Sequence, residues 1–257
     1  MSDNLSTVSK TLGRCICVIT GASKGFGQAL AYEVSRHLLP GSVLLLVARS
    51  QTLLQEVREE IQSGADDPVV HCIAADLSTR EGVDQTVTLA KNESSREVDH
   101  VLLVNNAASV GHISRIATLS DMDQLNSYFA LNASSPLALT AGLLQAFPPR
   151  AGLRWTLVNC SSVFALQGLP SFGLYCTGKA AREMMFKVLS KEQADVKVLN
   201  YSPGPMDTDM QTEIRTATGL QHELLPCQDS AAKLLKLLLD NEFSSGVLLD
   251  FFDIENK

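Results

Sequence analysis

The sequence predicts an α/β protein, built as a doubly wound sheet of seven mainly parallel strands with helices on both faces. Two observations lead to this prediction. Short apolar runs alternate with longer amphipathic stretches along nearly the whole chain, which is the order of elements in α/β folds. The runs are apolar throughout, as strands are when helices cover both faces of a parallel sheet.

The predicted strands are the apolar runs that polar or glycine-containing segments bound. They are residues 15–20, 42–48, 69–74, 100–105, 153–161, 196–202 and 246–252. In the first strand Cys15 and Cys17 lie two positions apart, so both should point to one face. They form no CxxC pair, and we expect no metal site.

The predicted helices fill the intervals between these strands. They are residues 25–38, 51–62, 79–91, 121–147, 174–191 and 228–240. The longest contains Pro136, which lacks a backbone N–H and should bend the helix or break one of its hydrogen bonds. The polar residues 1–13 are predicted to be a flexible N-terminal lead, and residues 14–257 a single domain.

Composition narrows the class of protein. The 257 residues are 45% hydrophobic and 19% charged, as in soluble globular proteins. The net charge of −7 argues against a nucleic-acid partner. No apolar run approaches the roughly 20 residues that cross a bilayer, and the N-terminus lacks the apolar stretch of a signal peptide. We therefore expect a cytoplasmic protein with reduced cysteines and no membrane partner.

A glycine-rich segment, TGASKGFG at residues 20–27, follows the first strand and opens the first helix. Glycines there let the backbone turn tightly and approach a pyrophosphate at the positive N-terminus of a helix. The segment therefore predicts a dinucleotide site. The contacts that we expect from it are those of Gly21, Ser23, Lys24, Gly25, Phe26 and Gly27.

The residues after the second strand indicate which dinucleotide binds. An NAD site needs an acidic residue there for the ribose 2′-hydroxyl, but this chain has Arg49 and Ser50. Arginine can grip a phosphate with paired donors, and Lys24 adds a second cation. The cofactor predicted is NADP(H); two solvated surface cations are the alternative.

Two further strand ends supply predicted cofactor contacts. Asp76 and Leu77 follow the third strand and could border the adenine. Asn105 and Ala107, at the end of the fourth strand and just after it, should lie along the crevice, because the carboxyl ends of parallel strands meet at one edge of the sheet.

A tyrosine and a lysine four residues apart, Tyr175 and Lys179, lie near the start of the helix after the fifth strand. Hydride transfer to a carbonyl leaves an alkoxide, which needs a proton, and a free phenol has a pKa of about 10. The ammonium of Lys179, with the charge of an oxidised nicotinamide, should lower the pKa of Tyr175. Ser162 could bind the substrate oxygen, and Asn132 could hold a water that relays protons to Lys179.

Together these residues resemble the short-chain dehydrogenase/reductase family, over almost the whole chain. The family pattern is a T-G-x-x-x-G-x-G loop, an N-N-A-G turn, a catalytic Asn, a Ser and Y-x-x-x-K. Here it reads Thr20 to Gly27, Asn105 to Ala108, Asn132, Ser162 and Tyr175 to Lys179. Ala108 stands where the family usually has glycine. The resemblance implies a Rossmann-type NADP(H)-dependent oxidoreductase that acts on CH–OH and C=O groups.

Within that family the chain is similar to members that reduce side-chain ketones of pterins in tetrahydrobiopterin biosynthesis. The segments that carry this likeness are VITGASKGFG, SSVFALQGLPSFGLYCTGKAAREMMF, LNYSPGPMDTDMQ and SGVLLDFFD. The resemblance implies that Asp250 anchors the pterin, since a carboxylate can accept its two neighbouring N–H groups. A solvated acid at a strand end is the alternative.

The resemblance also implies further contacts around the substrate. Ser162, Val163, Tyr175 and Gly204 should contact the substrate itself. The segment that closes over the nicotinamide should contribute Met206, Thr208, Asp209, Met210 and Gln211, with Thr208 on the carboxamide. Residues 212–229 are short for a lid over the substrate.

Residues 180–191, AAREMMFKVLSK, carry apolar groups on more than one helical face. One face should pack on the sheet, and the other indicates a homodimer contact; a buried contact within the chain is the alternative. Two other functions remain open beside pterin reduction: a broader carbonyl reductase for diketones or quinones, and a non-catalytic NADP-sensing protein, because a fold does not fix a function.

Overall fold

Seven parallel strands form one sheet in the computed structural model, which describes residues 10–62, 67–93 and 97–254. The order of strands across the sheet is β3-β2-β1-β4-β5-β6-β7. Their bounds are β1 Cys15–Thr20, β2 Val43–Ala48, β3 Val69–Ala74, β4 His100–Asn105, β5 Arg154–Cys160, β6 Val196–Ser202 and β7 Val247–Asp250. The predicted fold class is confirmed, and each neighbouring pair of these strands is parallel.

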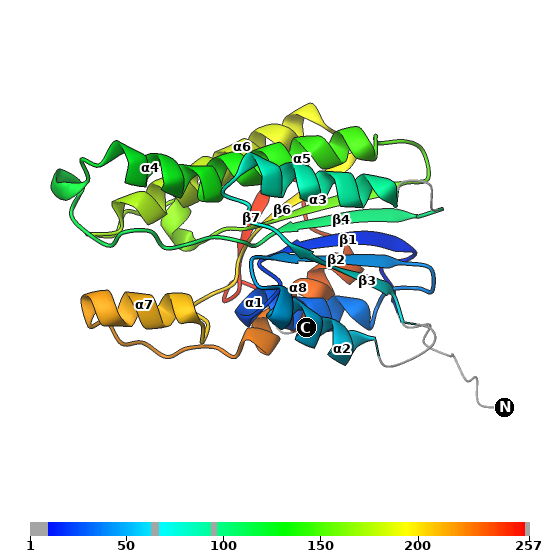
Figure 1. Cartoon of the computed structure of the whole chain (residues 1–257), viewed down its shortest axis with the longest axis horizontal. Coiled ribbons are helices and arrows are strands. Elements are labelled where there is room, and N and C mark those ends of the chain that lie inside the picture. Colours follow the sequence, from blue (N-terminus) through cyan, green and yellow to red (C-terminus); the bar gives the residue numbers. More distant parts are fainter. Residues whose placement is uncertain (1–9, 63–66, 94–96, 255–257) are drawn as a thin grey trace.

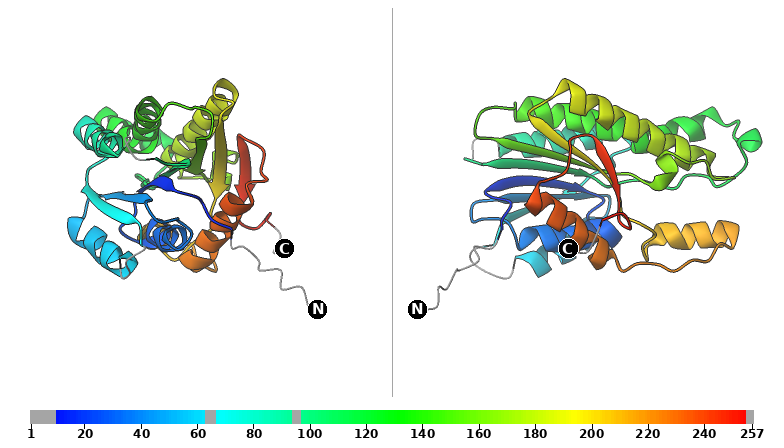
Figure 2. Two further views of the ribbon diagram at one scale, coloured as in Figure 1. Left: turned by 90° about the vertical axis from the view of Figure 1, so that its right-hand side faces the viewer. Right: turned by 180° about the vertical axis from the view of Figure 1, so that it is seen from behind.

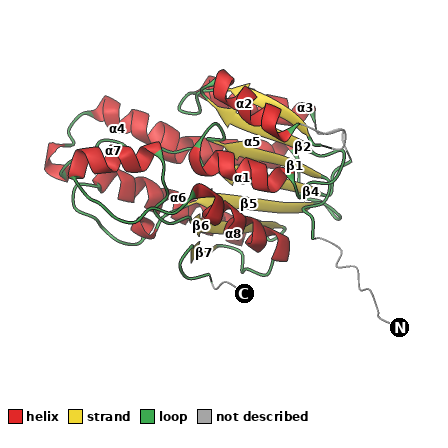
Figure 3. Ribbon diagram, turned by 90° about the horizontal axis from the view of Figure 1, so that it is seen from below, coloured by secondary structure: helices red, strands yellow, loops and turns green. Residues whose placement is uncertain are grey.

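Helices cover both faces of the sheet (Figures 1 and 2). One face carries α1 Gly25–Ser35, α2 Gln51–Ile61 and α8 Cys227–Asp240. The other carries α3 Arg80–Asn92, α5 Ser135–Ala146 and α6 Gly173–Glu192. Two more helices, α4 Met122–Phe129 and α7 Asp209–Thr218, project beyond the sheet at one end (Figure 3).

Side chains of each central strand alternate between two cores. Cys15 and Cys17 are fully buried in the core beneath α1 and α8, as their spacing predicts. Ile16 and Val18 are fully buried in the core beneath α5 and α6. Apolar burial on both sides is what makes these strands read as continuous apolar runs.

The direction of winding reverses between β1 and β4, which are neighbours in the sheet although β2 and β3 come between them in the chain. The loops that leave the carboxyl ends of β1 and β4 therefore run in opposite directions and open a crevice between them. In open α/β sheets ligands bind in such a crevice. The carboxyl ends of β1 and β4 lie at the same end of the molecule as α4 and α7 (Figure 1).

The long helix predicted at 121–147 is interrupted, as expected from its proline. A π-helical turn, Ala130–Ser134, separates α4 from α5, and Pro136 lies in the first turn of α5. Pro136 has no N–H to donate to the residue four positions earlier. The wider π turn accommodates that missing bond, and such turns are frequent at functional sites.

Two segments differ from their predicted structure. Part of the predicted flexible lead is packed, because the Leu12 side chain is fully buried and its backbone N–H donates to the carbonyl of His37 at 2.8 Å; residues 1–9 lie outside the described residues. The segment after β6 contains α7, which ends at Gly219 with φ +70°. This polar helix has no buried residue, so it gave no periodic apolar signal.

The described helices include none that is both long enough and apolar enough to span a membrane.

Candidate active site

The crevice between β1 and β4 is closed at its base by close backbone contacts. A Cβ atom added at Gly27 would lie 2.2 Å from the carbonyl oxygen of Gly21, so only glycine lets α1 approach the end of β1. From the other side, Asn106 donates through Nδ2 to the carbonyl oxygens of Thr20, at 2.9 Å, and Gly21, at 3.3 Å. These contacts fix the glycine-rich loop against the turn that follows β4.

The first turn of α1 fits a pyrophosphate. No side chain caps this helix at Lys24, and the first N–H groups of a helix have no intrahelical acceptor. The loop therefore presents free donors at the positive end of the helix. Ser23 lies half-buried in the loop, and the Phe26 ring is buried against Tyr201, with ring centroids 6.1 Å apart. Phe26 can therefore contact a cofactor only through its backbone.

The predicted adenosine contacts come together at the ends of β2 and β3. Arg49 is exposed, and its charge is one of the causes that lower the pKa of Asp76; the largest is the hydrogen bond from the Ser78 hydroxyl, at 2.7 Å. Ser50 accepts a hydrogen bond from the Leu53 N–H and caps α2. Leu77 is buried in the core, which leaves its backbone for any contact with a ligand.

The segment after β6 lies over the glycine-rich loop. Lys24 forms an ion pair with Asp209 in the first turn of α7, so two residues that were predicted separately as cofactor contacts bind each other. Thr208 is the residue before α7, and a Cβ atom added at Gly25 would lie 3.1 Å from its methyl group. Met206 is held by a bridge to Leu225. The two remaining predicted contacts, Met210 and Gln211, lie in the first turn of α7.

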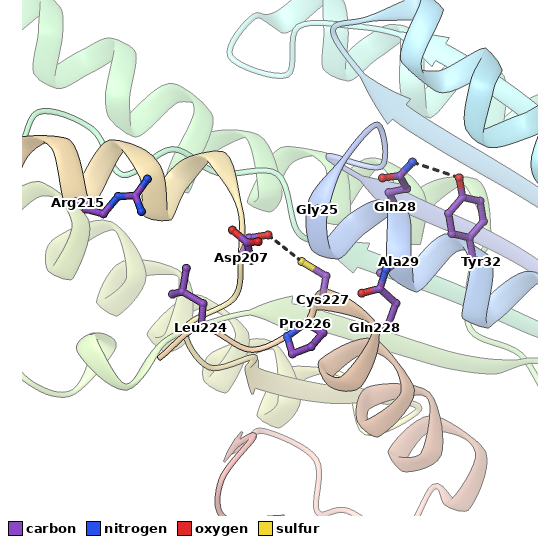
Figure 4. Close-up of a pocket in the computed structure, with 10 residues that line it drawn as sticks. All are labelled: Gly25, Gln28, Ala29, Tyr32, Asp207, Arg215, Leu224, Pro226, Cys227 and Gln228. Atoms are coloured by element: carbon purple, nitrogen blue, oxygen red, sulfur yellow. Dashed lines mark hydrogen bonds between the residues drawn. The ribbon is translucent and has the colours of Figure 1, made fainter. Parts of the chain in front are cut away.

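A cavity of about 660 Å³ lies beside this loop, between α1, α7 and the start of α8 (Figure 4). Asp207 and Arg215 give it one charge of each sign. Its wall includes Cys227, whose thiol donates to the carbonyl of Asp207 at 3.5 Å. Gly25 belongs to both the cavity and the predicted pyrophosphate loop, so solvent space extends along the outer side of that loop.

The predicted catalytic residues Tyr175, Lys179 and Ser162 come together at the carboxyl end of β5. Tyr175 and Lys179 lie on α6, with the ammonium 5.7 Å from the centre of the phenol ring. Lys179 is 7% exposed and donates to the carbonyl of Cys160 at 2.7 Å. Ser162 acts to lower the pKa of the Tyr175 phenol, and its hydroxyl accepts from the Phe164 N–H at 3.2 Å. Val163, next to it, is partly exposed.

Burial is the largest influence on the pKa of both Tyr175 and Lys179. Burial raises the pKa of Tyr175, and Ser162 opposes the rise. Burial, and then the charge of Arg182, lowers the pKa of Lys179 to about 7. The predicted lowering of the Tyr175 pKa by Lys179 and an oxidised nicotinamide stays a prediction, since it includes the charge of the bound cofactor.

Asn132 lies in the π turn, and its side chain is fully engaged. Its Oδ1 accepts from the Ser109 N–H at 3.0 Å, and its Nδ2 donates to the Tyr128 carbonyl at 2.9 Å and the Ser109 hydroxyl at 3.2 Å. Tyr128 in turn packs against Gly178 of α6. The amide of Asn132 therefore anchors the π turn beside the catalytic helix, which leaves its backbone carbonyl for the predicted water.

Asp250 and Gly204 lie at the carboxyl ends of the neighbouring strands β7 and β6. Asp250 ends β7 and is in register with Ser202 of β6. Its carboxylate accepts from the Ser202 hydroxyl at 2.5 Å and from the Phe252 N–H at 3.0 Å. Gly204 follows with φ +77°, a conformation that other residues rarely adopt. Asp250 is bonded to Ser202 and Phe252, whereas Tyr175 packs near Lys179. Both residues lie at the carboxyl edge of the sheet.

One functional candidate, Arg182, escaped the sequence analysis because it lies beneath this edge. Arg182 is 1% exposed, and its guanidinium donates to the Asn105 carbonyl, to the Ala107 carbonyl at 3.2 Å and to Asn159 Oδ1 at 2.8 Å. The Asn105 side chain is buried and donates to the Thr140 hydroxyl. Its amide is therefore turned to Thr140, and the predicted contact of this residue with a cofactor stays a prediction. The sequence did contain a signal for Arg182. It follows Tyr175 by seven residues on one helix, and this spacing places both side chains on the same helical face.

Within the described residues, no group of three or more His, Cys, Asp and Glu side chains could hold a metal ion.

Comparisons with known proteins agree with this geometry. A family model described as short chain dehydrogenase matches residues 15–219. Sepiapterin reductase of Meriones unguiculatus is 45% identical over 258 residues, which cover 94% of this chain and 98% of that protein. Sepiapterin reductase of Xenopus laevis is 44% identical over 255 residues, with 94% and 97% covered.

Two more distant proteins share the architecture. Benzil reductase ((S)-benzoin forming) of Bacillus subtilis is 30% identical over 205 residues, 78% of either chain. The crystal structure of a 3-ketoacyl-(acyl-carrier-protein) reductase from Brucella melitensis, complexed with NADH, superimposes with a TM-score of 0.77 at 26% identity, over 94% of this chain and 98% of that one. The chain is an oxidoreductase that belongs to the short-chain dehydrogenase/reductase family and resembles the sepiapterin reductases over nearly its whole length.

Proposed function

We propose that the protein reduces the side-chain ketones of pterins, such as sepiapterin and 6-pyruvoyl-tetrahydropterin, with NADPH in tetrahydrobiopterin biosynthesis. The observation that carries this proposal is Asp250, a carboxylate held at the same edge of the sheet as Ser162 and Tyr175. The likeness to sepiapterin reductases over nearly the whole of both chains supports it.

The setting of Asp250 suits a pterin. The Ser202 hydroxyl and the Phe252 N–H each occupy one lone pair of a different carboxylate oxygen. Each oxygen keeps another lone pair for an N–H group of a ligand. The amino group and ring N–H of a pterin lie side by side, so both can bind one carboxylate, and such charge-assisted bonds are strong.

An exposed aromatic ring lies beside that carboxylate. The Phe252 side chain is 64% exposed, and a Cβ atom added at Gly204 would lie 3.5 Å from it. The same Cβ would lie 2.9 Å from Leu225 Cδ1, so the lack of a side chain at Gly204 lets Leu225 and Phe252 pack close to this backbone. A bicyclic pterin can therefore lie against the exposed Phe252 ring while Asp250 binds its edge.

The residues at the end of β5 would manage the proton. A bound nicotinamide cofactor supplies hydride to the ketone carbon. The raised pKa of Tyr175 keeps its phenol protonated near neutral pH, which is the form that can give a proton to the developing alkoxide. The Ser162 hydroxyl binds the same oxygen. Lys179 and the backbone carbonyl of Asn132 lead the replacement proton to Tyr175.

Two cations would select NADP(H) over NAD(H). Arg49 is exposed at the end of β2, where an acid would otherwise bind the ribose hydroxyl. Lys24 lies in the glycine-rich loop and can exchange its ion pair with Asp209 for a phosphate. Both side chains of that ion pair are exposed to solvent, so little free energy is lost when the pair breaks.

A second candidate function is the reduction of diketones. The likeness to benzil reductase favours it. A diketone needs the groups at Ser162 and Tyr175, but it has no N–H groups for Asp250. The role of Asp250 therefore separates the two functions.

A homodimer is also proposed. Met184 and Val188, one turn apart on α6, are 61% and 45% exposed, and Leu137 on the neighbouring α5 is 47% exposed. Apolar side chains of this kind on adjacent helices suit a contact with a second copy of the chain.

The test compares two substrates in Asp250→Asn. NADPH oxidation is followed by absorbance with sepiapterin and, separately, with benzil. The catalytic efficiency kcat/KM for sepiapterin should fall about 10- to 100-fold, since an amide accepts from only one oxygen and carries no charge. The value for benzil should change less than about twofold.

Asp253→Asn is the matched control, because Asp253 is an exposed acid three residues further on. It should leave both rates unchanged. Equal losses for the two substrates in Asp250→Asn would favour the diketone reductase. If the wild type bound NADPH but oxidised it with neither substrate, a cofactor-sensing protein would be the better description.

A further inference from the structure

A buried arginine lies directly beneath the candidate catalytic pair. Arg182 follows Tyr175 by seven residues and Lys179 by three on α6, so all three share one face of the helix. Its side chain is 1% exposed. A buried cation is expensive unless its donors are satisfied, and its partners here belong to other elements.

The partners of Arg182 lie at the ends of two strands. It donates to the carbonyl oxygens of Asn105 and Ala107, in the turn that lines the cofactor crevice, and through Nε to Asn159 Oδ1 at 2.8 Å. Asn159 is in register with Asn105 of β4 and with Asn200 of β6, and it donates to Asn200 at 2.8 Å. The guanidinium therefore ties the catalytic helix to the carboxyl ends of β4, β5 and β6.

The same side chain places a permanent positive charge beside the pair, because guanidinium does not lose its proton near neutral pH. The other titratable or charged groups near it come from three elements. They are Tyr175, Lys179 and Glu183 of α6, Cys160 of β5 and Tyr128 of α4.

Of these groups, Glu183 is the acid, and it is engaged elsewhere. It accepts from Ser161 at 2.8 Å and pairs with Lys187 at 3.2 Å. The charge of Arg182 therefore acts on Lys179 and Tyr175 without a direct carboxylate partner to neutralise it.

We propose that Arg182 is a positioning residue for the reduction, which fixes α6 against the Asn105–Ala107 turn and so holds Tyr175 and Lys179 in place beside the crevice. This role rests on the proposed reductase function. This role explains why a cation is buried where an apolar residue would otherwise pack. The N–H donors of the guanidinium are arranged like a fork, and they reach two carbonyl oxygens and one amide oxygen at once.

The acidity of Lys179 supports this role. Burial and then Arg182 lower the pKa of Lys179 to about 7. Removal of the Arg182 charge should therefore raise that pKa, so that the ammonium survives at higher pH. Replacement by another cation should leave it nearly unchanged.

The experiment measures kcat/KM for the ketone against pH in Arg182→Met and Arg182→Lys. In the wild type kcat/KM should fall as the pH rises, because Lys179 loses its charge. The midpoint of the fall should lie near the pKa of Lys179, about 7. Arg182→Met should move that midpoint up by about one pH unit and lower kcat about tenfold or more. Arg182→Lys should keep the midpoint but still lower kcat about tenfold, because an ammonium cannot make the three bonds of the fork.

Lys191→Met, which removes an exposed cation from the last turn of α6, is the matched control and should behave as the wild type. An unchanged midpoint in Arg182→Met would overturn the proposal. If that variant does not fold, Arg182→Lys decides, because a kcat equal to that of the wild type would show that the fork is dispensable.

A second measurement needs no substrate. The ultraviolet absorbance of phenolate is titrated with and without the Tyr175→Phe change, so that the difference reports Tyr175 alone. Its midpoint should be higher in Arg182→Met than in the wild type, since Arg182 also lowers the pKa of Tyr175. This result would hold even if sepiapterin and benzil were not substrates, whereas equal midpoints would count against Arg182 itself.

Discussion

The ammonium of Lys179 lies 5.7 Å from the centre of the Tyr175 ring and donates a hydrogen bond to the carbonyl of Cys160 at 2.7 Å. The lysine is therefore fixed to the end of β5 rather than to the phenol oxygen. Its position beside the ring lets it act on the tyrosine through its charge. Ser162 also acts on the phenol, because it opposes the rise that burial causes in the pKa of Tyr175.

Removal of the Tyr175 hydroxyl should abolish most of the reductase activity. In Tyr175→Phe, kcat should fall about 10²- to 10⁴-fold, the usual contribution of a positioned proton donor. The rate is measured by NADPH absorbance, and circular dichroism should show an unchanged fold. Tyr32→Phe, the same chemical change on α1, should keep its rate; a Tyr175→Phe enzyme with more than half the wild-type rate would exclude the phenol as the proton donor.

Arg49 should determine the preference for NADPH. Arg49→Ala should raise the KM for NADPH about 10- to 100-fold, because a charge-assisted bond to phosphate is lost, and should leave the KM for NADH nearly unchanged. Arg58→Ala, on the exposed side of α2 where Arg58 bonds Gln62, provides the comparison. Equal effects on both cofactors would mean that Arg49 contacts no phosphate.

A charged residue in the exposed apolar patch of α6 should separate the subunits. The double variant Met184→Asp and Val188→Asp should sediment as a monomer where the wild type sediments as a dimer, because burial of two carboxylates in an interface is costly. Leu53→Asp, an equivalent change on α2 at the opposite face of the sheet, should remain dimeric. A wild type that is monomeric at all concentrations would disprove the predicted contact.

His100 should make stability fall in mild acid. It is 1% exposed, and burial lowers its pKa to about 3. Arg154 can only donate, so His100 Nδ1 accepts from it at 2.8 Å while Nε2 bonds Thr156 at 2.9 Å. The folded state thus holds His100 neutral, whereas the unfolded chain takes up a proton below about pH 6.5.

The sign of the effect follows from that lowered pKa. The stabilisation is complete above pH 6.5 and is lost at about 1.4 kcal/mol per pH unit as the pH falls toward 3. Urea unfolding at pH 7 and pH 5 should therefore show a loss of about 2 kcal/mol that His100→Asn does not show. His222→Asn, at an exposed position, should follow the wild type. Identical pH dependence in His100→Asn would contradict the assignment of this loss to His100.

The strands were predicted closely because their signal is local. β1, β3, β4 and β6 have the predicted bounds, since continuous apolar runs between polar segments mark strands buried on both faces. The last strand ends at Asp250 instead of residue 252, because the Asp250 side chain accepts from the Phe252 N–H and turns the chain. That bond depends on geometry that an apolar run does not encode.

The sequence by itself determined the order of the strands and of the helices that pack on the sheet, because periodicity and turn residues are local properties of the chain. With that order came the sheet edge that gathers Gly21, Ser162, Tyr175 and Asp250. Only the tertiary structure decided the acidity of Tyr175 and Lys179, the pairing of Lys24 with Asp209, and the burial of Arg182 against β4 and β5. The physical reason is that pKa values and buried hydrogen bonds depend on solvent exclusion and on distances between groups far apart in the chain.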